Sequence, residues 1–516
     1  MKTDKITSSY RKNLGEHQFV VDVSMQKMDE GGISKVLSAT SDASINEIEM
    51  LNGEAHYSGE IVFNLLYVDE NGENHVLSES VDISGKIEDE QITPTMKPVY
   101  TLEVVEIKVN SVGDDTVKLN ATLNLKLDAM QAEEVDEVIV DSPSVEVNHE
   151  EVSYNKLVTT GTKSFEVSEE YDSKANVKHV LLTSHHLELK NVTAGTGYLT
   201  VDGEIFVNSL LEVETDEGVT LKNFMQTLPF KEEIEDELIE KDDNVFAFAF
   251  VRPRDIKVSV VTGEVTEEGV TPPSSTLKVE ATVTVKYFAE RAMTTEVYTD
   301  AFSMTNKTNL VSRTFETAKP VICERFFTTI DGQTVIGDDE PRIAKICAIT
   351  NEHLLVANSS VQDGELTIEG VAYVTVVYVT DDDTPILNSV DLEIPFANKF
   401  DTDKDFGDNL FVVSDIMDVD AKAKKGKDIN VNLDVCFLAY GYGTNTQVAI
   451  KEIELTEELP KSEYSLEMYI APKGSTLWDV SKHMLITEDV LLAQNPDLIF
   501  PLEESKTIVY FRQLNN

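Results

Sequence analysis

The chain contains only three cysteines and one tryptophan among its 516 residues. Cys323, Cys347 and Cys436 are odd in number and far apart, so they predict neither a disulfide framework nor a cysteine zinc site. The sequence also has no apolar run of the length that a transmembrane helix needs. Its opening residues lack the apolar core of a signal peptide. We therefore expect a cytoplasmic location and no membrane-spanning segment.

Basic residues are scarce relative to acidic ones. Lys and Arg number 43 against 94 Asp and Glu, which gives a formal net charge of -51. A surface of that sign repels polyphosphates and anionic lipid headgroups, so nucleic acid is not an expected partner. The hydrophobic fraction of 41% is nevertheless that of a folded protein, and 516 residues exceed what one hydrophobic core holds. The composition therefore predicts several globular domains.

Motifs that organise catalytic chemistry are absent from the sequence. It has no HExxH or CxxC metal motif, no GxSxG nucleophile elbow, no P-loop and no GxGxxG fingerprint. The adjacent pair His185-His186 lies in a strand-like segment, where neighbouring side chains point to opposite faces, and this predicts two surface histidines. Acidic turns at 69–72 and 381–383 lack the glutamate that completes a calcium loop. We therefore expect no enzyme activity, no cofactor and no bound metal.

One segment that begins with glycine occurs three times. Gly59-Glu-Ile-Val-Phe-Asn-Leu-Leu recurs as Gly203-Glu-Ile-Phe-Val-Asn-Ser-Leu and, more loosely, as Gly370-Val-Ala-Tyr-Val-Thr-Val-Val. Each copy continues into a polar turn and a second strand-like run. Each glycine also follows a lysine at a nearly equal distance, at positions Lys35, Lys178 and Lys345. Agreement over this length predicts one structural unit repeated three times.

Alternation of apolar and polar residues predicts that the units are built from antiparallel strands. The apolar positions of one such strand are Val117, Leu119, Ala121, Leu123 and Leu125. Asn71-Gly72 is typical of a hairpin turn. The sequence thus predicts a mostly β protein with three repeated antiparallel β-sandwich-like domains, at residues 1–150, 151–316 and 317–460. Polar stretches at 133–147 and 292–312 are expected to be spacers.

The pattern changes after residue 460. Residues 467–470 and 507–511 are typical of short strands, and two short helices are expected to begin near residues 477 and 487. Hydroxyl groups of Ser475 and Thr476 can cap the first helix, and Asn495-Pro496 ends the second. These signals predict a small α+β domain of βααβ order at residues 464–516.

The run Pro472-Lys-Gly-Ser-Thr-Leu-Trp, the later Leu491-Leu-Ala-Gln-Asn-Pro and the closing strand resemble a LysM domain. Members of that family bind N-acetylglucosamine chains in a groove. The resemblance implies one side of the groove at Gly474, Ser475, Thr476, Leu477 and Trp478, and the other side at Asn495, Pro496, Asp497 and Leu498. Family members generally have aspartate at position 475 and glycine at position 502, and these departures favour a protein partner. For Trp478 itself, packing in the core of the domain is the first expectation.

Three repeats followed by a LysM-like module resemble the SipL-like spore coat morphogenesis proteins, whose repeats are called SPOCS domains. The resemblance implies a scaffold or adaptor without enzymatic activity in endospore coat assembly. It implies a place in the mother-cell cytoplasm at the forespore surface. The implied partners are the spore coat morphogenetic ATPase, bound partly through the LysM domain, and other coat proteins. The alternative is a LysM protein of the cell envelope or spore surface layer that binds peptidoglycan or N-acetylglucosamine.

Overall fold

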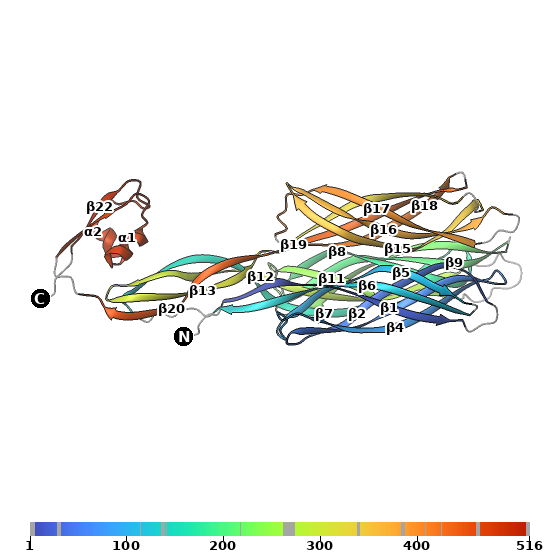
Figure 1. The fold of residues 1–516 in the computed structure, drawn as a ribbon, viewed down its shortest axis with the longest axis horizontal. Coiled ribbons are helices and arrows are strands. Elements are labelled where there is room, and N and C mark those ends of the chain that lie inside the picture. Colours follow the sequence, from blue (N-terminus) through green and yellow to red (C-terminus); the bar gives the residue numbers. More distant parts are fainter. Residues whose placement is uncertain are drawn as a thin grey trace.

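The computed structural model describes residues 6–27, 32–113, 115–135, 140, 142–216, 218–261, 274–337, 341–382, 387–407, 409–424, 426–460 and 465–511. These residues form antiparallel sheets and two short helices, which confirms the prediction of a mostly β protein. Figure 1 shows an elongated molecule with a broad body of long strands, a narrower stalk and a small module beyond the stalk. No helix among the described residues is long and apolar enough to cross a membrane.

The first repeat consists of two three-stranded sheets, with strand orders β1-β6-β5 and β2-β3-β4. Their bounds are β1 (Ile6–Gln26), β2 (Ile33–Met50), β3 (Glu54–Asp69), β4 (Asn74–Glu88), β5 (Lys97–Val112) and β6 (Thr116–Val135). Alternate residues of β3 and β6, such as Ile61, Leu65, Leu119 and Leu123, are fully buried in one cluster shared by the two sheets. Each sheet therefore turns one face towards the core of the repeat, as its alternating sequence requires.

The second and third repeats follow the same plan. Sheets β7-β12-β11 and β8-β9-β10 share one hydrophobic cluster, and sheets β14-β19-β18 and β15-β16-β17 share another. Second-repeat strands are β7 (Val145–Asp172), β8 (Asn176–Gly195), β9 (Tyr198–Thr215), β10 (Gly218–Glu235), β11 (Asn244–Val261) and β12 (Thr276–Ser303). Third-repeat strands are β14 (Ile322–Val335), β15 (Ile343–Gln362), β16 (Glu365–Thr380), β17 (Leu387–Asp401), β18 (Asn409–Lys424) and β19 (Asp428–Tyr442). Three copies of one arrangement thus build the body.

The three repeated glycines occupy the same structural position. Each faces a β-bulge in the neighbouring strand, with Gly59 opposite Ile45, Gly203 opposite Leu189 and Gly370 opposite Val356. In every repeat the backbone carbonyl oxygen that precedes this opposing residue lies so close to the glycine that a Cβ atom would overlap it. Glycine is therefore required by a close approach of two backbones.

Strand register also corrects one detail of the repeat alignment. When the three repeats are aligned by the pairing of their strands, Lys35 and Lys345 correspond to His179 of the second repeat and not to Lys178. The third repeat has an additional bulge between Thr350 and His353, which lengthens its strand by one residue. Because of this extra residue, the distance from lysine to glycine in the third repeat, when applied to the second repeat, leads to Lys178 instead of His179.

All three repeats meet in one apolar cluster, which we call the central cluster. Leu66, Leu210 and Val377 lie at equivalent positions in their repeats and are almost completely buried there. The other buried members are Leu37, Leu182, Leu221, Cys347 and Ala348. Apolar burial at the meeting point of three equivalent sheets joins the repeats into one body.

A stalk of paired strands extends from this body. The outer parts of β7 and β12 continue past the second repeat and pack against the pair β13 (Asn306–Ala318) and β20 (Thr444–Glu458). Val152, Tyr154, Val297, Phe315 and Ala449 form its buried core. The stretch 292–312, which was expected to be a polar spacer, continues β12 and begins β13. Within the stretch 133–147, residues 133–135 and 145–147 also belong to strands, while 136–139 and 141 lie outside the described residues.

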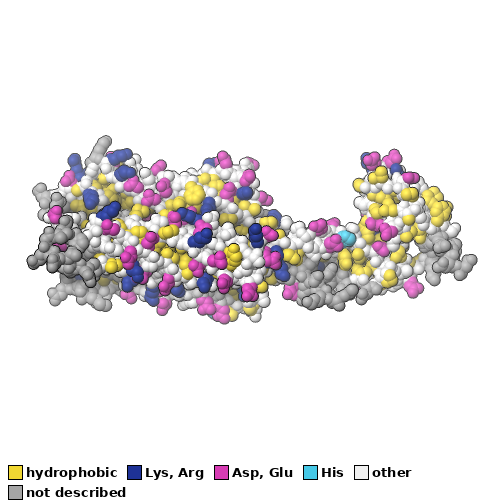
Figure 2. All heavy atoms as spheres, turned by 180° about the vertical axis from the view of Figure 1, so that it is seen from behind, with side chains coloured by type: hydrophobic (Ala, Val, Ile, Leu, Met, Phe, Trp, Pro, Cys, Tyr) yellow, Lys and Arg dark blue, Asp and Glu magenta, His cyan; other side chains and the backbone are white. Residues whose placement is uncertain are grey.

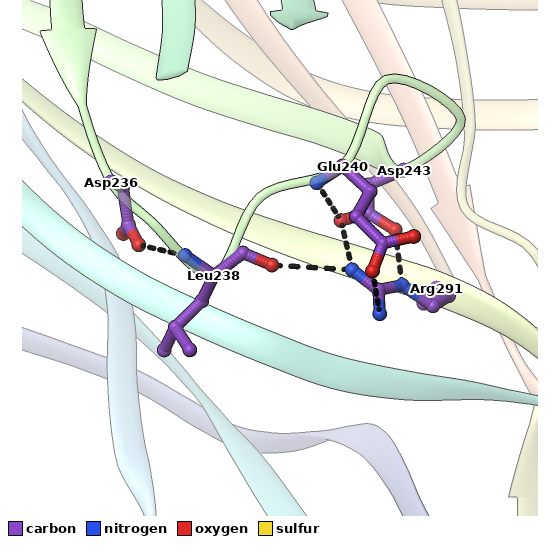
Figure 3. A network of polar contacts seen from close by, with 5 residues as sticks. All are labelled: Asp236, Leu238, Glu240, Asp243 and Arg291. Carbon is purple, nitrogen blue, oxygen red and sulfur yellow. Dashed lines mark hydrogen bonds and ion pairs between the residues drawn. The ribbon is translucent and has the colours of Figure 1, made fainter. Parts of the chain in front are cut away.

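A polar network fixes the loop that crosses from one sheet of the second repeat to the other (Figure 3). The Arg291 guanidinium donates to both carboxylate oxygens of Asp243, at 2.7 and 2.9 Å, and to the Leu238 carbonyl at 3.2 Å. The side chain of Asp243 is only 1% exposed. Burial acts to raise the pKa of Asp243, but the hydrogen bonds from Arg291 outweigh it and lower that pKa. Strand β12 thereby holds the loop between β10 and β11.

The terminal module contains β21 (Leu466–Ala471), α1 (Leu477–Met484), α2 (Glu488–Gln494) and β22 (Lys506–Phe511) in that order. Its two strands pair antiparallel, and the helices cover them. The buried residues between them are Ala471, Val480, Met484, Ile486, Leu491, Leu502 and Ile508. A separate core of this kind indicates that the module is its own folding unit.

Candidate functional site

The first side of the expected groove is a tightly bonded turn. The hydroxyl of Thr476 accepts from the Asp479 amide at 3.1 Å, while the Asp479 carboxylate accepts from the Thr476 amide at 2.9 Å, a reciprocal N-cap of α1. Gly474 has a φ of 88°. Its amide donates to the Leu502 carbonyl at 2.7 Å, and the Leu502 amide donates to the Ser475 carbonyl at 3.0 Å. The turn is thus joined to the loop that follows α2.

The second side is built around Asn495. Its amide nitrogen donates to the carbonyls of Leu491 at 3.0 Å and Val509 at 2.9 Å, and its amide oxygen accepts from the Val509 amide at 3.3 Å. These bonds connect the end of α2 to β22 and engage both N–H groups and the oxygen of the side-chain amide. Of the remaining predicted residues, Leu477 and Leu498 pack against the module core, and Pro496 and Asp497 are exposed. The polar groups needed to hold a glycan are therefore partly used by the fold itself.

Trp478 is not in the core of the module, contrary to the first expectation for this side chain. Its indole lies against Phe302 at the end of β12, with ring centroids 5.2 Å apart, and its Nε1 donates to Asp300 at 2.9 Å. Lys482, one turn further along α1, contacts both oxygens of the same carboxylate at 2.6 Å. The predicted groove side therefore faces the stalk through a contact that we call the stalk latch: Asp300, Phe302, Trp478 and Lys482.

The electrostatics of the stalk latch centre on Asp300. Partial burial acts to raise the pKa of Asp300, but the hydrogen bonds from Lys482 and Trp478 outweigh it and hold that pKa below its usual value. The ammonium and carboxylate remain partly exposed, at 43% and 27%, so this pair contributes only about 1 kcal/mol or less. Asp300, Phe302 and Lys482 had no sequence signal, because contacts between residues so far apart, 178 positions for Asp300 and Trp478 and 182 for Asp300 and Lys482, leave no local pattern.

Replacement of Asp300 by asparagine is expected to release the module from the stalk. The variant loses the ion pair with Lys482 and weakens the acceptor for the indole, about 1–2 kcal/mol in total. Since Trp478 is the only tryptophan of the chain, its fluorescence reports this contact alone. We expect a red-shifted emission and faster quenching by iodide. The matched control is Glu296→Gln, an exposed acid on the same strand; an unchanged spectrum in Asp300→Asn would contradict the latch.

Apolar side chains are exposed on the outer face of the module. Leu466, Met468 and Ile470 alternate along β21 and are 46%, 63% and 71% exposed, and Phe511 on β22 is 65% exposed. Figure 2 shows hydrophobic side chains gathered on this module, whereas charges of both signs are interspersed over the body. We call these four residues the outer apolar face. A contiguous apolar surface of this kind is typical of protein contacts.

One acidic turn holds groups that suit a cation. Asp69, Glu73 and His75 offer ligand atoms within 4.8 Å of one another in the turn between β3 and β4. Asp69 is 3% exposed, and a backbone hydrogen bond from Glu73 is the main cause that lowers the pKa of its carboxyl. The carboxylate already accepts bonds that shape the turn, at 2.8 Å from Glu73 and 2.9 Å from Asn71. In the other acidic turn, Asp383 lies outside the described residues, and the expectation of no bound metal stays a prediction.

Comparison with protein families finds one match. Residues 32–112 match the family described as SipL, SPOCS domain. Neither the curated proteins nor the solved structures contain a match to the chain. The matched segment corresponds to strands β2, β3, β4 and β5, which are the strands that bear the first repeated glycine, its bulge and part of the central cluster.

Proposed function

We propose that this SipL-like chain, whose SPOCS domain indicates a role in sporulation, is a non-enzymatic scaffold in endospore coat assembly. The observation that carries the proposal is the family match at residues 32–112. By their register, residues 176–261 and 343–424 repeat the matched arrangement, so we assign all three repeats to the SPOCS type. The protein would act in the mother-cell cytoplasm at the forespore surface.

The shape of the molecule supports a scaffold. Three repeats joined by the central cluster form one long body, and the stalk holds the terminal module away from it (Figure 1). Such an arrangement presents several separate surfaces at fixed distances, which suits simultaneous contact with more than one partner. The partners that we propose are the coat morphogenetic ATPase and other coat proteins.

The terminal module, which we assign as a LysM-like domain, is the proposed contact for the coat ATPase. Its strand-helix-helix-strand order and the position of Thr476 as helix cap support this assignment. The outer apolar face favours a protein partner, because apolar anchors supply most of the binding energy of protein interfaces. The fully engaged amide of Asn495 argues against the alternative of a glycan ligand.

Deletion of residues 464–516 is expected to abolish capture of the coat ATPase from extracts of sporulating cells. The double variant Met468→Ser, Ile470→Ser should weaken capture at least tenfold, because it removes two exposed anchors of the outer apolar face. Phe327 and Val335, which are 58% and 60% exposed on β14, provide the matched control when both are changed to serine. Capture that survives the deletion contradicts the docking role, and co-sedimentation of the intact chain with purified peptidoglycan would support the glycan-binding alternative.

A further inference from the structure

A cavity of about 450 Å³ lies where the three repeats meet. Its lining comes from β2 and β5 of the first repeat, β8 and β11 of the second, and β15 and β18 of the third. We call it the central cavity. Its volume falls within the range of small-molecule sites, and its place between domains is typical of them.

Equivalent residues of the three repeats line this cavity. Asp42 pairs with Val62, His186 with Phe206 and His353 with Tyr373, and these partners occupy the same position after the three repeated glycines. The prediction that His185 and His186 are surface residues is therefore wrong, because β8 lies at the junction of the repeats. Burial lowers the pKa of His186 to about 4, so its imidazole is neutral at physiological pH.

Many polar atoms in the wall of the central cavity have no hydrogen-bond partner in the described part of the protein. Ser44 is only 7% exposed and its hydroxyl is unpartnered. The same holds for inaccessible atoms of five other lining residues: Ser41 Oγ, Thr101 Oγ1, His186 Nε2, Glu352 Oε2 and His353 Nε2. Buried polar groups without partners cost about 1–3 kcal/mol each, so a ligand that satisfied them would stabilise the fold.

Glu352 is the most informative of these groups. Its Oε1 accepts from the Ser184 hydroxyl at 3.1 Å and from the Asn208 amide at 3.4 Å, whereas Oε2 is buried and has no hydrogen-bond partner among the described residues. Burial raises the pKa of Glu352, against the lowering effect of these hydrogen bonds. No cation of the described residues forms an ion pair with this carboxylate within 4.0 Å, and an isolated buried carboxylate is costly unless a positive charge accompanies it.

The rest of the lining also suits a positive charge. Asp42 and Asp415 add two carboxyl groups, and burial raises the pKa of both, to about 7 for Asp415. Of the other charged groups at the wall, Glu103 already pairs with Lys126 at 3.3 Å and the Nε2 of His185 lies 3.8 Å from Asp42. Aromatic side chains of β5 and β11 also line the cavity, at Tyr100, Phe248 and Phe250. The Lys286 ammonium already lies 4.3 Å from the Tyr100 ring centre and 5.4 Å from that of Phe250. Carboxylates combined with aromatic faces are the groups that recognise organic ammonium ions.

We propose that the central cavity binds a small organic cation of the alkylammonium class, with the Glu352 carboxylate as its counter-ion. A bare metal ion fits less well: among the described residues, the group that brings three metal-ligand atoms within 4.8 Å is Asp69, Glu73 and His75, which is not in this cavity.

Isothermal titration of the intact chain with putrescine tests the proposal, with 1,4-butanediol as the uncharged ligand of equal length. We expect the diamine to bind and to raise the thermal unfolding temperature, and the diol to do neither. Glu352→Gln should weaken putrescine binding at least tenfold, and Glu369→Gln, an exposed acid of the same repeat, should leave it unchanged.

A second variant, Phe250→Leu, removes an aromatic ring from the lining of the cavity without changing its charge and should also weaken binding of the diamine. The test therefore does not depend on whether Glu352→Gln folds. Absence of putrescine binding to the native chain at millimolar concentration would overturn the proposal. Equal binding of diamine and diol, or binding that neither variant weakens, would overturn it as well. Capture of the coat ATPase is measured separately, so either proposal can fail without the other.

Discussion

Replacement of Gly203 by alanine is expected to lower the free energy of unfolding by about 3 kcal/mol or more, because the new methyl group would overlap the Glu188 carbonyl oxygen and the Phe230 ring. Neither the carbonyl oxygen nor the ring can move aside at a low cost in free energy. The carbonyl belongs to a bulged strand in the same sheet, and Phe230 packs in the core of the second repeat. Thermal unfolding of the intact chain, followed by circular dichroism, measures the loss.

The other two repeats supply parallel tests of the same geometry. Gly59→Ala would meet the Ser44 carbonyl and Gly370→Ala the Leu355 carbonyl, so both are expected to destabilise to a similar degree. Gly113→Ala is the matched control, since a Cβ there meets nothing closer than the Thr116 carbonyl at 3.4 Å. If the three repeat variants unfold at the temperature of this control, the close approach of the two backbones at these glycines is wrong.

Replacement of Arg11 by methionine is expected to cost about 2 kcal/mol or more, the usual contribution of a cation–π contact that is shielded from water. Arg11 is 7% exposed on β1, and its guanidinium lies 4.8 Å from the Phe288 ring centre and 5.3 Å from that of Tyr442. It therefore contacts the second and third repeats from the first. Methionine keeps much of the side-chain volume, so the loss in free energy of unfolding measures the contribution of the charged group.

The positive charge of Arg11 affects the pKa of two buried carboxyl groups. Asp128 accepts from the Tyr442 hydroxyl at 2.7 Å, and burial raises the pKa of its carboxyl although this hydrogen bond and the positive charge of Arg11 oppose the rise. Glu290 is 2% exposed, and burial raises its pKa to about 7 although Arg11 opposes the rise. Because that value lies above the ordinary value of 4.5, the folded state loses stability as pH rises from about 4.5 to about 7, and the loss levels off above the folded pKa.

The destabilisation by Arg11→Met should therefore be larger at pH 8 than at pH 5. At pH 5 Glu290 is protonated with or without Arg11, whereas at pH 8 the native protein gains from the attraction between Arg11 and the ionised Glu290, and the variant does not. Denaturant unfolding at the two pH values measures the difference. Lys108→Met removes an exposed cation on β5 and should cost about 1 kcal/mol or less at either pH; an Arg11→Met loss that is independent of pH would contradict the proposed role of Glu290.

The repeated glycine segment shows how far sequence reasoning carries for the fold. Alternation along 117–125 and the spacing of Gly59, Gly203 and Gly370 were sufficient for strands, for the mostly β class and for repetition, because both signals are local and periodic. The one-residue error at Lys178 arose from a bulge in the third repeat, which no local pattern records. The polar stretch 292–312 was expected to be a spacer because its strands lie in a slender stalk, where few side chains are buried.

For the candidate site, the order of elements in the terminal module and the cap at Thr476 followed from the sequence, since capping depends on residues three positions apart. The latch of Trp478 on Asp300 and the central cavity did not, because both join residues of different repeats or modules. The sequence by itself determined the elements, their repetition and the SPOCS resemblance. Only the tertiary structure decided which polar groups are buried together, because that depends on how whole sheets pack, and their packing is set by contacts distant along the chain.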